Sequence, residues 1–186
     1  LKVEVLAADE QASDNNEASI VLRVAYNDIS FLLTGDMGIS GEKELMARED
    51  VQATILKAGH HGSNTSSSPS FIEAVSPQAT ILSYGEDNKY GHPHIEVINA
   101  LQSVGSDIYG TAEAGTIVVK TDGATYEVAA PTWTGDGTAS AKTRSKSGKV
   151  DILSKDVHGE IVGIQNNSDV DVSLAGWQLI SVEGDQ

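Results

Sequence analysis

The sequence predicts an α/β fold for residues 1–130, and two observations support this class. Short segments rich in Ile, Val and Leu, which are typical of strands, recur along this region. Segments with helix-start signals lie between them. No apolar run approaches the roughly 20 residues of a membrane-spanning helix, so we expect no membrane contact from this segment. Because alternating strands and helices form layered α/β domains, we expect one such domain here.

Each predicted strand is short and rich in branched aliphatic residues. After an opening strand at residues 1–8, the predicted strands are 20–26, 29–33, 53–57, 79–83, 116–120 and 125–129. Asn27 and Asp28 separate the first two of these, and both residue types tolerate positive φ. We therefore expect a tight hairpin turn there.

Three helices are predicted between the strands, over residues 41–48, 69–75 and 93–104. Ser68 followed by Pro69 is a good N-cap and first-turn pair for the second helix. Gly105 ends the third. The third helix carries an apolar residue at every third position, which predicts one stripe packed on a sheet: Ile95, Ile98, Leu101 and Val104.

Residues 131–149 predict a flexible basic linker, because Thr, Ser, Gly, Ala and Lys dominate there. A nucleic-acid-contacting arm is the alternative interpretation of its basic residues. Short strand-like segments follow at 150–153, 160–165 and 177–182, separated by polar turns. Residues 150–186 therefore predict the start of a β-sandwich that stops before it closes.

Composition restricts the chemistry. The 186-residue chain has no cysteine, so any metal must be held by His, Asp, Glu or Asn. Its formal charge of −15 argues against a passive nucleic-acid binder, whose affinity comes from Lys and Arg. An enzyme is exempt from that argument, because bound divalent metals supply positive charge locally. The opening residue, Leu1 inside a strand-like segment, leads us to expect a fragment of a longer protein.

The first candidate site residue is Asp36, which follows the strand 29–33 through Thr34 and Gly35. In α/β sheets the carboxyl ends of strands form the ligand crevice, so a carboxylate there is presented to ligands. An ordinary turn is the alternative for this short motif.

Two imidazoles, His60 and His61, follow the strand 53–57 and are flanked by glycines. Neutral histidine is the commonest nitrogen ligand for zinc, manganese or iron. Since successive residues cannot easily chelate one ion, we expect His61 to ligate and His60 to contact substrate or support the site. Ser63 and Ser66 belong to a hydroxyl-rich loop before a helix start, which suits a phosphate; simple capping is the alternative.

A second histidine pair, His92 and His94, follows the strand 79–83 and lies beside a predicted helix start. A helix N-terminus lowers an imidazole pKa, which leaves a neutral ring able to accept or relay a proton. Lys89 and Tyr90 add donors that are compatible with phosphate. A pH-sensitive cap is the alternative, and the fifth histidine, His158, has no companions.

These motifs together resemble, in order and spacing, the extracytoplasmic metallo-β-lactamase domain of ComEC-type competence proteins. The resemblance rests on Asn16 and on residues 19–22, 31–36, 60–63, 66–69 and 90–94. It implies the C-terminal half of a four-layer αββα sandwich with two divalent ions, zinc or manganese. It further implies that Asp36 bridges the two ions and that His60 or His61 ligates the second ion. Asn16 or Asn15 would lie near the position of another ligand. Residues 91–94 would line the substrate side of the site.

The chain departs from that family in lacking the HxHxDH element that supplies most ligands of the first metal. We therefore expect an upstream half of the same domain to complete the site, and the fragment alone to be inactive. Residues 160–179 are similar to the first strands of a lamin-tail domain, an immunoglobulin-like sandwich that often accompanies secreted bacterial hydrolases. Together the two resemblances imply an extracellular or cell-surface bacterial protein.

The resemblance implies metal-dependent hydrolysis of DNA or another phosphodiester. In that interpretation His92, His94 and Ser63 are catalytic, while Asn16, Ser66, Lys89 and Tyr90 contact substrate. Two alternatives remain: a small-ester or lactone hydrolase of the same fold, and a metal-free cell-surface binding module.

Overall fold

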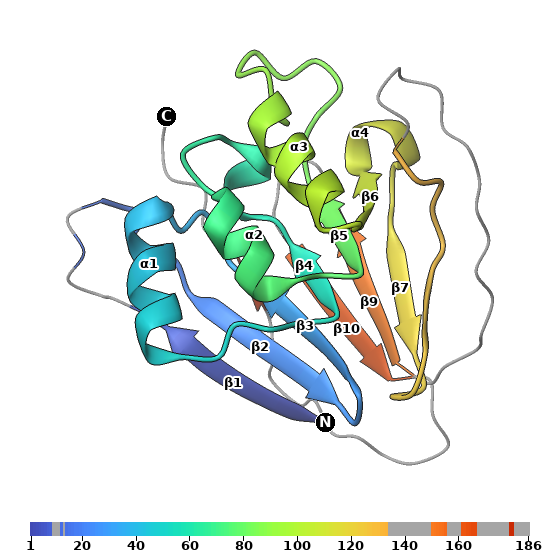
Figure 1. Ribbon diagram of the computed structural model, residues 1–186. Coiled ribbons are helices and arrows are strands. Elements are labelled where there is room, and N and C mark those ends of the chain that lie inside the picture. The colour runs from blue at the N-terminus through green and yellow to red at the C-terminus, as the bar shows by residue number, and fades with distance from the viewer. Residues whose placement is uncertain (9–11, 13, 134–149, 156–160, 167–178, 181–186) are drawn as a thin grey trace.

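The computed structural model describes residues 1–8, 12, 14–133, 150–155, 161–166 and 179–180. Two β-sheets pack against each other, and helices cover the outer face of the first sheet (Figure 1). This arrangement confirms the predicted α/β class.

The first sheet has the order β1-β2-β3-β4-β5-β6. Its strands are β1 (Lys2–Ala7), β2 (Val21–Tyr26), β3 (Ile29–Leu33), β4 (Ile55–Lys57), β5 (Ala79–Leu82) and β6 (Asp107–Gly110). The pairs β1–β2 and β2–β3 are antiparallel, whereas β3 to β6 run parallel. Asn27 has a φ of 51° and Tyr26 pairs with Ile29, which confirms the predicted hairpin turn.

Three helices link the parallel strands: α1 (Ile39–Arg48), α2 (Pro69–Val75) and α3 (Ile95–Ser103). The Ser68 hydroxyl accepts from the backbone N–H of Phe71 and so caps α2 as predicted. The predicted stripe of α3 was wrong at Ile95, which is 62% exposed, while Val97 is buried instead. Ile95 is the first helical residue, where the chain has not yet turned onto the sheet.

Side chains of the first sheet alternate between two cores, as expected for strands buried on both faces. Leu32, Leu56 and Leu82 pack in the helix-side core. Their neighbours Phe31, Ile55 and Ile81 pack in the core shared with the second sheet. The described layers are therefore helices, first sheet and second sheet.

The second sheet has the order β11-β10-β9-β7-β8. Its strands are β7 (Val118–Thr121), β8 (Tyr126–Val128), β9 (Val150–Lys155), β10 (Ile161–Asn166) and β11 (Leu179–Ile180). A short helix, α4 (Thr111–Ala114), precedes β7. β9 pairs antiparallel with β7, so the region predicted as a separate module extends this sheet. Most of the predicted linker, residues 134–149, lies outside the described residues.

Within the residues that the structure describes, every helix is too short or too polar to cross a membrane.

Candidate functional site

Asp36 lies in a turn at the carboxyl end of β3. Gly35 has a φ of 56°, and a Cβ at that position would approach the Ser19 side chain to 2.9 Å. The backbone N–H of Asp36 donates to the Ser19 hydroxyl at 2.9 Å. One carboxylate oxygen, Oδ1, is buried and has no hydrogen-bond partner. A buried carboxylate oxygen without a hydrogen bond is costly, and ordered water or an ion is the usual partner of such an atom.

The histidine pair forms a tight turn, Gly59–Gly62, at the carboxyl end of β4. His60 and His61 both have positive φ, 46° and 56°, a conformation uncommon for residues other than glycine. The backbone N–H of His60 donates to the Gly35 carbonyl at 3.1 Å, which joins this turn to the Asp36 turn.

His61 Nδ1 lies 2.8 Å from the Ser83 carbonyl oxygen. A carbonyl only accepts, so Nδ1 carries the proton and Nε2 of the neutral ring carries the lone pair. This tautomer is the usual one for a histidine that ligates a metal through Nε2.

The second pair lies on the loop between β5 and α3. The Asn88 side chain accepts from the His92 N–H at 2.9 Å and donates to the carbonyls of His92 and Gly85. His94 is the N-cap residue of α3, and its backbone N–H donates to the Gly62 carbonyl at 2.9 Å. This backbone hydrogen bond joins the start of α3 to the histidine turn, Gly59–Gly62.

His94 has the opposite tautomer to His61. Its Nδ1 accepts from the backbone N–H of Asn64 at 3.2 Å, so the proton of the neutral ring is on Nε2.

The four rings form one imidazole cluster, defined as His60, His61, His92 and His94. His92 is central, with ring centroids 5.8 Å from His60, 6.2 Å from His61 and 5.1 Å from His94. Burial lowers the pKa of His92 to about 4, and the three neighbouring imidazoles act in the same direction. Asp36 raises the pKa of His92 and so lies close enough to interact with it. His92 is therefore neutral at neutral pH.

The structure thus brings together five predicted site residues, Asp36 and the imidazole cluster. Tyr90 joins them, because its ring stacks on His92 with centroids 5.7 Å apart. Lys89 Nζ lies 5.6 Å from the Tyr90 ring centroid.

Three other predicted site residues lie in the loops and turns that follow or precede the strands. Ser63 is 4% exposed and its hydroxyl bonds the Thr65 hydroxyl at 2.9 Å. Ser66 is 1% exposed and its hydroxyl donates to the Met37 carbonyl. Asn16 lies in the turn that precedes β2, three residues before Ser19. The roles predicted for these residues in catalysis and substrate binding stay predictions.

Sequence reasoning missed Ser19 and Asn88, which hold Asp36 and His92 respectively. It also missed Glu42 of α1, a buried carboxylate that accepts from the backbone N–H groups of Ser67 and Ser68. The one signal that could have indicated the role of Asn88 is its position four residues before His92, within reach of the His92 backbone.

The donors fit a divalent metal in chemistry but are incomplete in number. A carboxylate oxygen and an imidazole nitrogen suit zinc or manganese. Within the part of the chain that the structure describes, no three His, Asp or Glu side chains are arranged to hold one ion.

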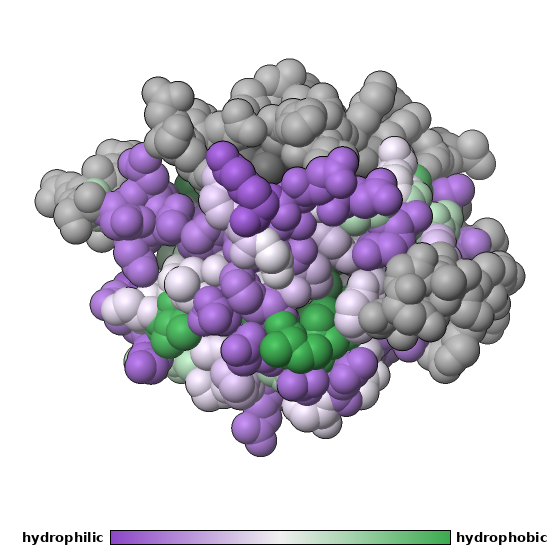
Figure 2. Space-filling view, turned by 90° about the horizontal axis from the view of Figure 1, so that it is seen from above, coloured by the Kyte–Doolittle hydropathy of each residue, from purple (hydrophilic) through white to green (hydrophobic). Residues whose placement is uncertain are grey.

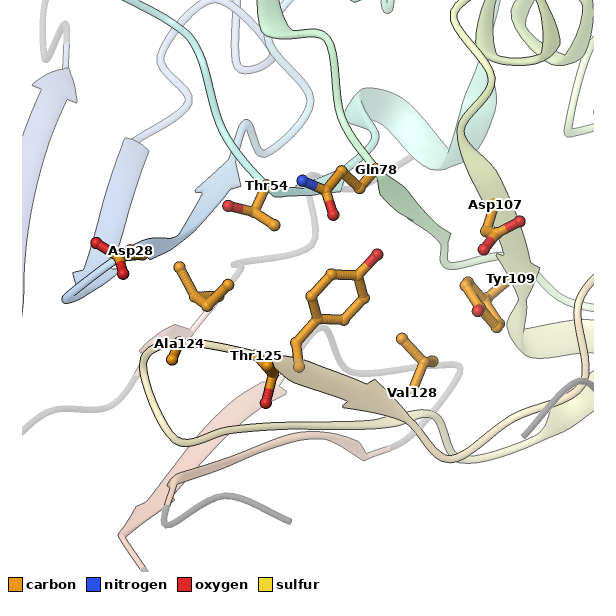
Figure 3. A pocket seen from close by; sticks show the side chains of 10 residues that line it. Asp28, Thr54, Gln78, Asp107, Tyr109, Ala124, Thr125 and Val128 are labelled. Atoms are coloured by element: carbon orange, nitrogen blue, oxygen red, sulfur yellow. The ribbon is translucent and has the colours of Figure 1, made fainter. Parts of the chain in front are cut away.

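A cavity of about 430 Å³ lies at the opposite edge of the first sheet, where the parallel strands begin (Figure 3). Thr54, Gln78 and Asp107 line it from the starts of β4, β5 and β6. Thr125 and Tyr126 of the second sheet line its other side. None of the predicted site residues lines this cavity.

The chain is similar to parts of several known proteins. The chain is 40% identical over 111 residues to ComE operon protein 3 of Bacillus subtilis, covering 59% of this chain and 14% of that protein. It is 39% identical over 106 residues to competence protein ComA of Neisseria gonorrhoeae, covering 56% of this chain and 15% of the relative. It is 35% identical over 107 residues to recombination protein 2 of Haemophilus influenzae, covering 58% and 13%.

The chain is therefore a homologue of one segment of these competence-related proteins, and the aligned segment spans less than a sixth of their length. No protein-family model matches the chain.

Proposed function

We propose that this chain carries part of the active site of a metal-dependent phosphodiesterase that acts on DNA during uptake or scavenging. The name of the Neisseria relative, a competence protein, supports the connection to DNA uptake. The layering of helices, sheet and sheet supports the C-terminal half of a metallo-β-lactamase sandwich. An extracellular or cell-surface location belongs to the same proposal.

The observation that carries the proposal is the buried, unpaired Oδ1 of Asp36, a residue whose charge acts on His92 at the centre of the imidazole cluster. Asp36 and His61 would hold metal, with His60 as the alternative ligand. Two divalent ions bound there would supply a water of lowered pKa and positive charge opposite a phosphate. The remaining ligands would come from an upstream half of the domain.

The other residues of this chain would handle the proton and the phosphate. His94 presents an Nε2–H donor, which would bond a phosphate oxygen or protonate the leaving oxygen. His92 is neutral and would accept or relay a proton. Ser63 would contribute through its loop, in which the Thr65 hydroxyl contacts both the Ser63 hydroxyl and Nδ1 of the His60 ring.

Metal binding by the full-length gene product, in which the upstream half would supply the remaining ligands, tests whether the Asp36 carboxylate holds metal. Equilibrium dialysis against Mn²⁺ or Zn²⁺ should show binding that falls at least about tenfold in Asp36→Asn, because the amide replaces a charged ligand. His158→Gln is the matched control and should bind like the wild type. Equal binding by wild type and Asp36→Asn would remove Asp36 from the site and leave the metal-free binding module as the better interpretation.

Substrate class is tested with the full-length gene product that contains this chain. Metal-loaded protein should cleave single-stranded DNA and a small phosphodiester, and Asp36→Asn should abolish both activities. Cleavage of a lactone or carboxylic ester without either phosphodiester would favour the small-ester hydrolase.

A further inference from the structure

Two exposed apolar side chains flank the second histidine pair. Tyr90 is 48% exposed and Ile95 is 62% exposed, whereas most large apolar side chains of the described residues are buried. Both belong to the loop and helix start that carry His92 and His94. In Figure 2, which looks down on the end of the molecule bearing this loop in Figure 1, hydrophobic patches interrupt a mostly hydrophilic face.

The Tyr90 ring is held in a defined orientation. It stacks on His92 with an interplanar angle of 24°. Asn88 in turn fixes the His92 backbone through bonds to both its N–H and its carbonyl. A tyrosine that served only as a hydroxyl donor would need no such support for its ring plane. The support instead preorganises the plane of an exposed aromatic side chain.

A flat aromatic ring suits the face of a nucleobase. Lys89 Nζ lies over this ring, and its flexible side chain would swing aside when a base stacks there. Base stacking on aromatic side chains is the main sequence-tolerant contact of single-stranded nucleic acid. Lys89 Nζ lies 5.6 Å from the ring centroid and can reach a phosphate adjoining the stacked base. In a duplex the base faces are already covered by their neighbours, so only unpaired nucleotides present a free face.

The charge of the molecule favours stacking over backbone attraction. The chain carries −15 formally, and Glu86 and Asp87, both exposed, precede Lys89 in the loop. A surface of this kind gains little from counterion release. Binding therefore has to depend on base contacts, which do not weaken steeply with salt.

We propose that Tyr90, stacked on His92, is the platform on which an unpaired nucleobase of the substrate lies, so that the site prefers single-stranded DNA. This inference deepens the proposed function and depends on it for the identity of the substrate. It assigns Tyr90 to specificity through its ring rather than its hydroxyl.

The test is binding of a fluorescent oligothymidylate of about six nucleotides to the 186-residue chain, measured by anisotropy in the presence of a chelator. An abasic oligonucleotide of the same length has the same phosphates without bases. The wild type should bind the thymidylate about 5- to 150-fold more tightly than the abasic strand. Tyr90→Ala should lose that preference and Tyr90→Phe should keep it.

The matched control is Tyr26→Ala, on β2 at the opposite edge of the sheet, which should bind like the wild type once circular dichroism confirms its fold. Unchanged thymidylate binding by Tyr90→Ala, equal binding of the abasic strand, or no binding by the wild type would each overturn the inference. Because the assay excludes metal, those results leave the hydrolase proposal to its own metal-binding and cleavage tests. Conversely, stacking without metal binding would overturn only the hydrolase.

Discussion

At the scale of single residues, backbone groups give two histidines of the cluster opposite tautomers. The Ser83 carbonyl holds the proton of His61 on Nδ1, and the Asn64 N–H holds the proton of His94 on Nε2. The cluster therefore contains one ring whose Nε2 carries a lone pair and another whose Nε2 carries a proton. At Nε2, His61 therefore presents an acceptor and His94 a donor.

The tautomers are directly measurable. We predict that long-range ¹H–¹⁵N correlation spectra at neutral pH will show the Nδ1–H form for His61 and the Nε2–H form for His94. His61→Gln and His94→Gln provide the assignments, since each removes one set of signals. The same tautomer at both rings would contradict the assignment made from the two backbone contacts.

His92 should affect stability at acidic pH. Its pKa is lowered from 6.5 to about 4 in the fold, mainly by burial. The unfolded chain therefore binds a proton between these values when the folded chain does not, so stability falls as the pH drops from 6.5 towards 4 and levels off below. Urea denaturation of the metal-free chain should show this decline more strongly in the wild type than in His92→Phe, which keeps an aromatic ring but cannot titrate. Parallel pH profiles of the two proteins would contradict it.

At the scale of elements, the loop between the histidine turn and α2 is anchored by α1, which also packs against α2. Glu42 of α1 accepts from the backbone N–H groups of Ser67 and Ser68. The Ser67 hydroxyl in turn accepts from the Gly59 N–H, next to His60. Burial raises the pKa of Glu42 more than these hydrogen bonds lower it. A helix remote from the cluster therefore positions one of its turns.

Glu42→Ala should destabilise the fold and disturb the cluster. Removing the carboxylate leaves two buried N–H donors unpaired, which costs about 1–3 kcal/mol for each donor. Urea denaturation measures the loss, and the ring signals of His60 and His61 report the displaced turn. Glu44→Ala, an exposed position on the same helix, is the control and should change stability by less than about 0.5 kcal/mol. A Glu42→Ala protein as stable as that control would show that the contacts contribute nothing.

Local signals allowed most elements to be predicted, and tertiary pairing explains the misses. The Asn27–Asp28 turn and the Ser68 cap are encoded by adjacent residues, so both could be predicted. β6 could not, because only Ile108 and Tyr109 are apolar between Asp107 and Gly110, and its partner is the parallel strand β5.

In the candidate site, too, local sequence patterns could be recognised and tertiary contacts could not. The histidine pairs could be recognised because each follows a strand, and parallel strands end at one edge of the sheet. The groups that fix their tautomers are a backbone carbonyl and a backbone N–H, which any residue type supplies. No side-chain pattern could therefore have indicated them.

At the scale of the whole molecule, the second sheet covers the face of the first sheet that the helices leave open. Ile117, Val119 and Val128 supply its share of the core between the sheets. β7 is flanked by β8 on one edge and by β9 on the other. The sequence predicts residues 150–186 as a separate module, whereas the strand pairing makes β9 part of this sheet.

Truncation after Trp133 distinguishes these two descriptions. Without β9, β7 and β8 form a two-stranded ribbon, and sheets gain stability from three or more strands with a hydrophobic face. We therefore predict that residues 1–133 unfold at a lower urea concentration than the full chain, and that the β7 amides exchange faster with solvent. The imidazole cluster should keep its ring signals, because the hydrogen bonds that orient it come from residues 35–94 of the first sheet and its loops. If both chains instead unfold at the same urea concentration, residues 150–186 contribute nothing to the α/β domain and form the independent module that the sequence predicts.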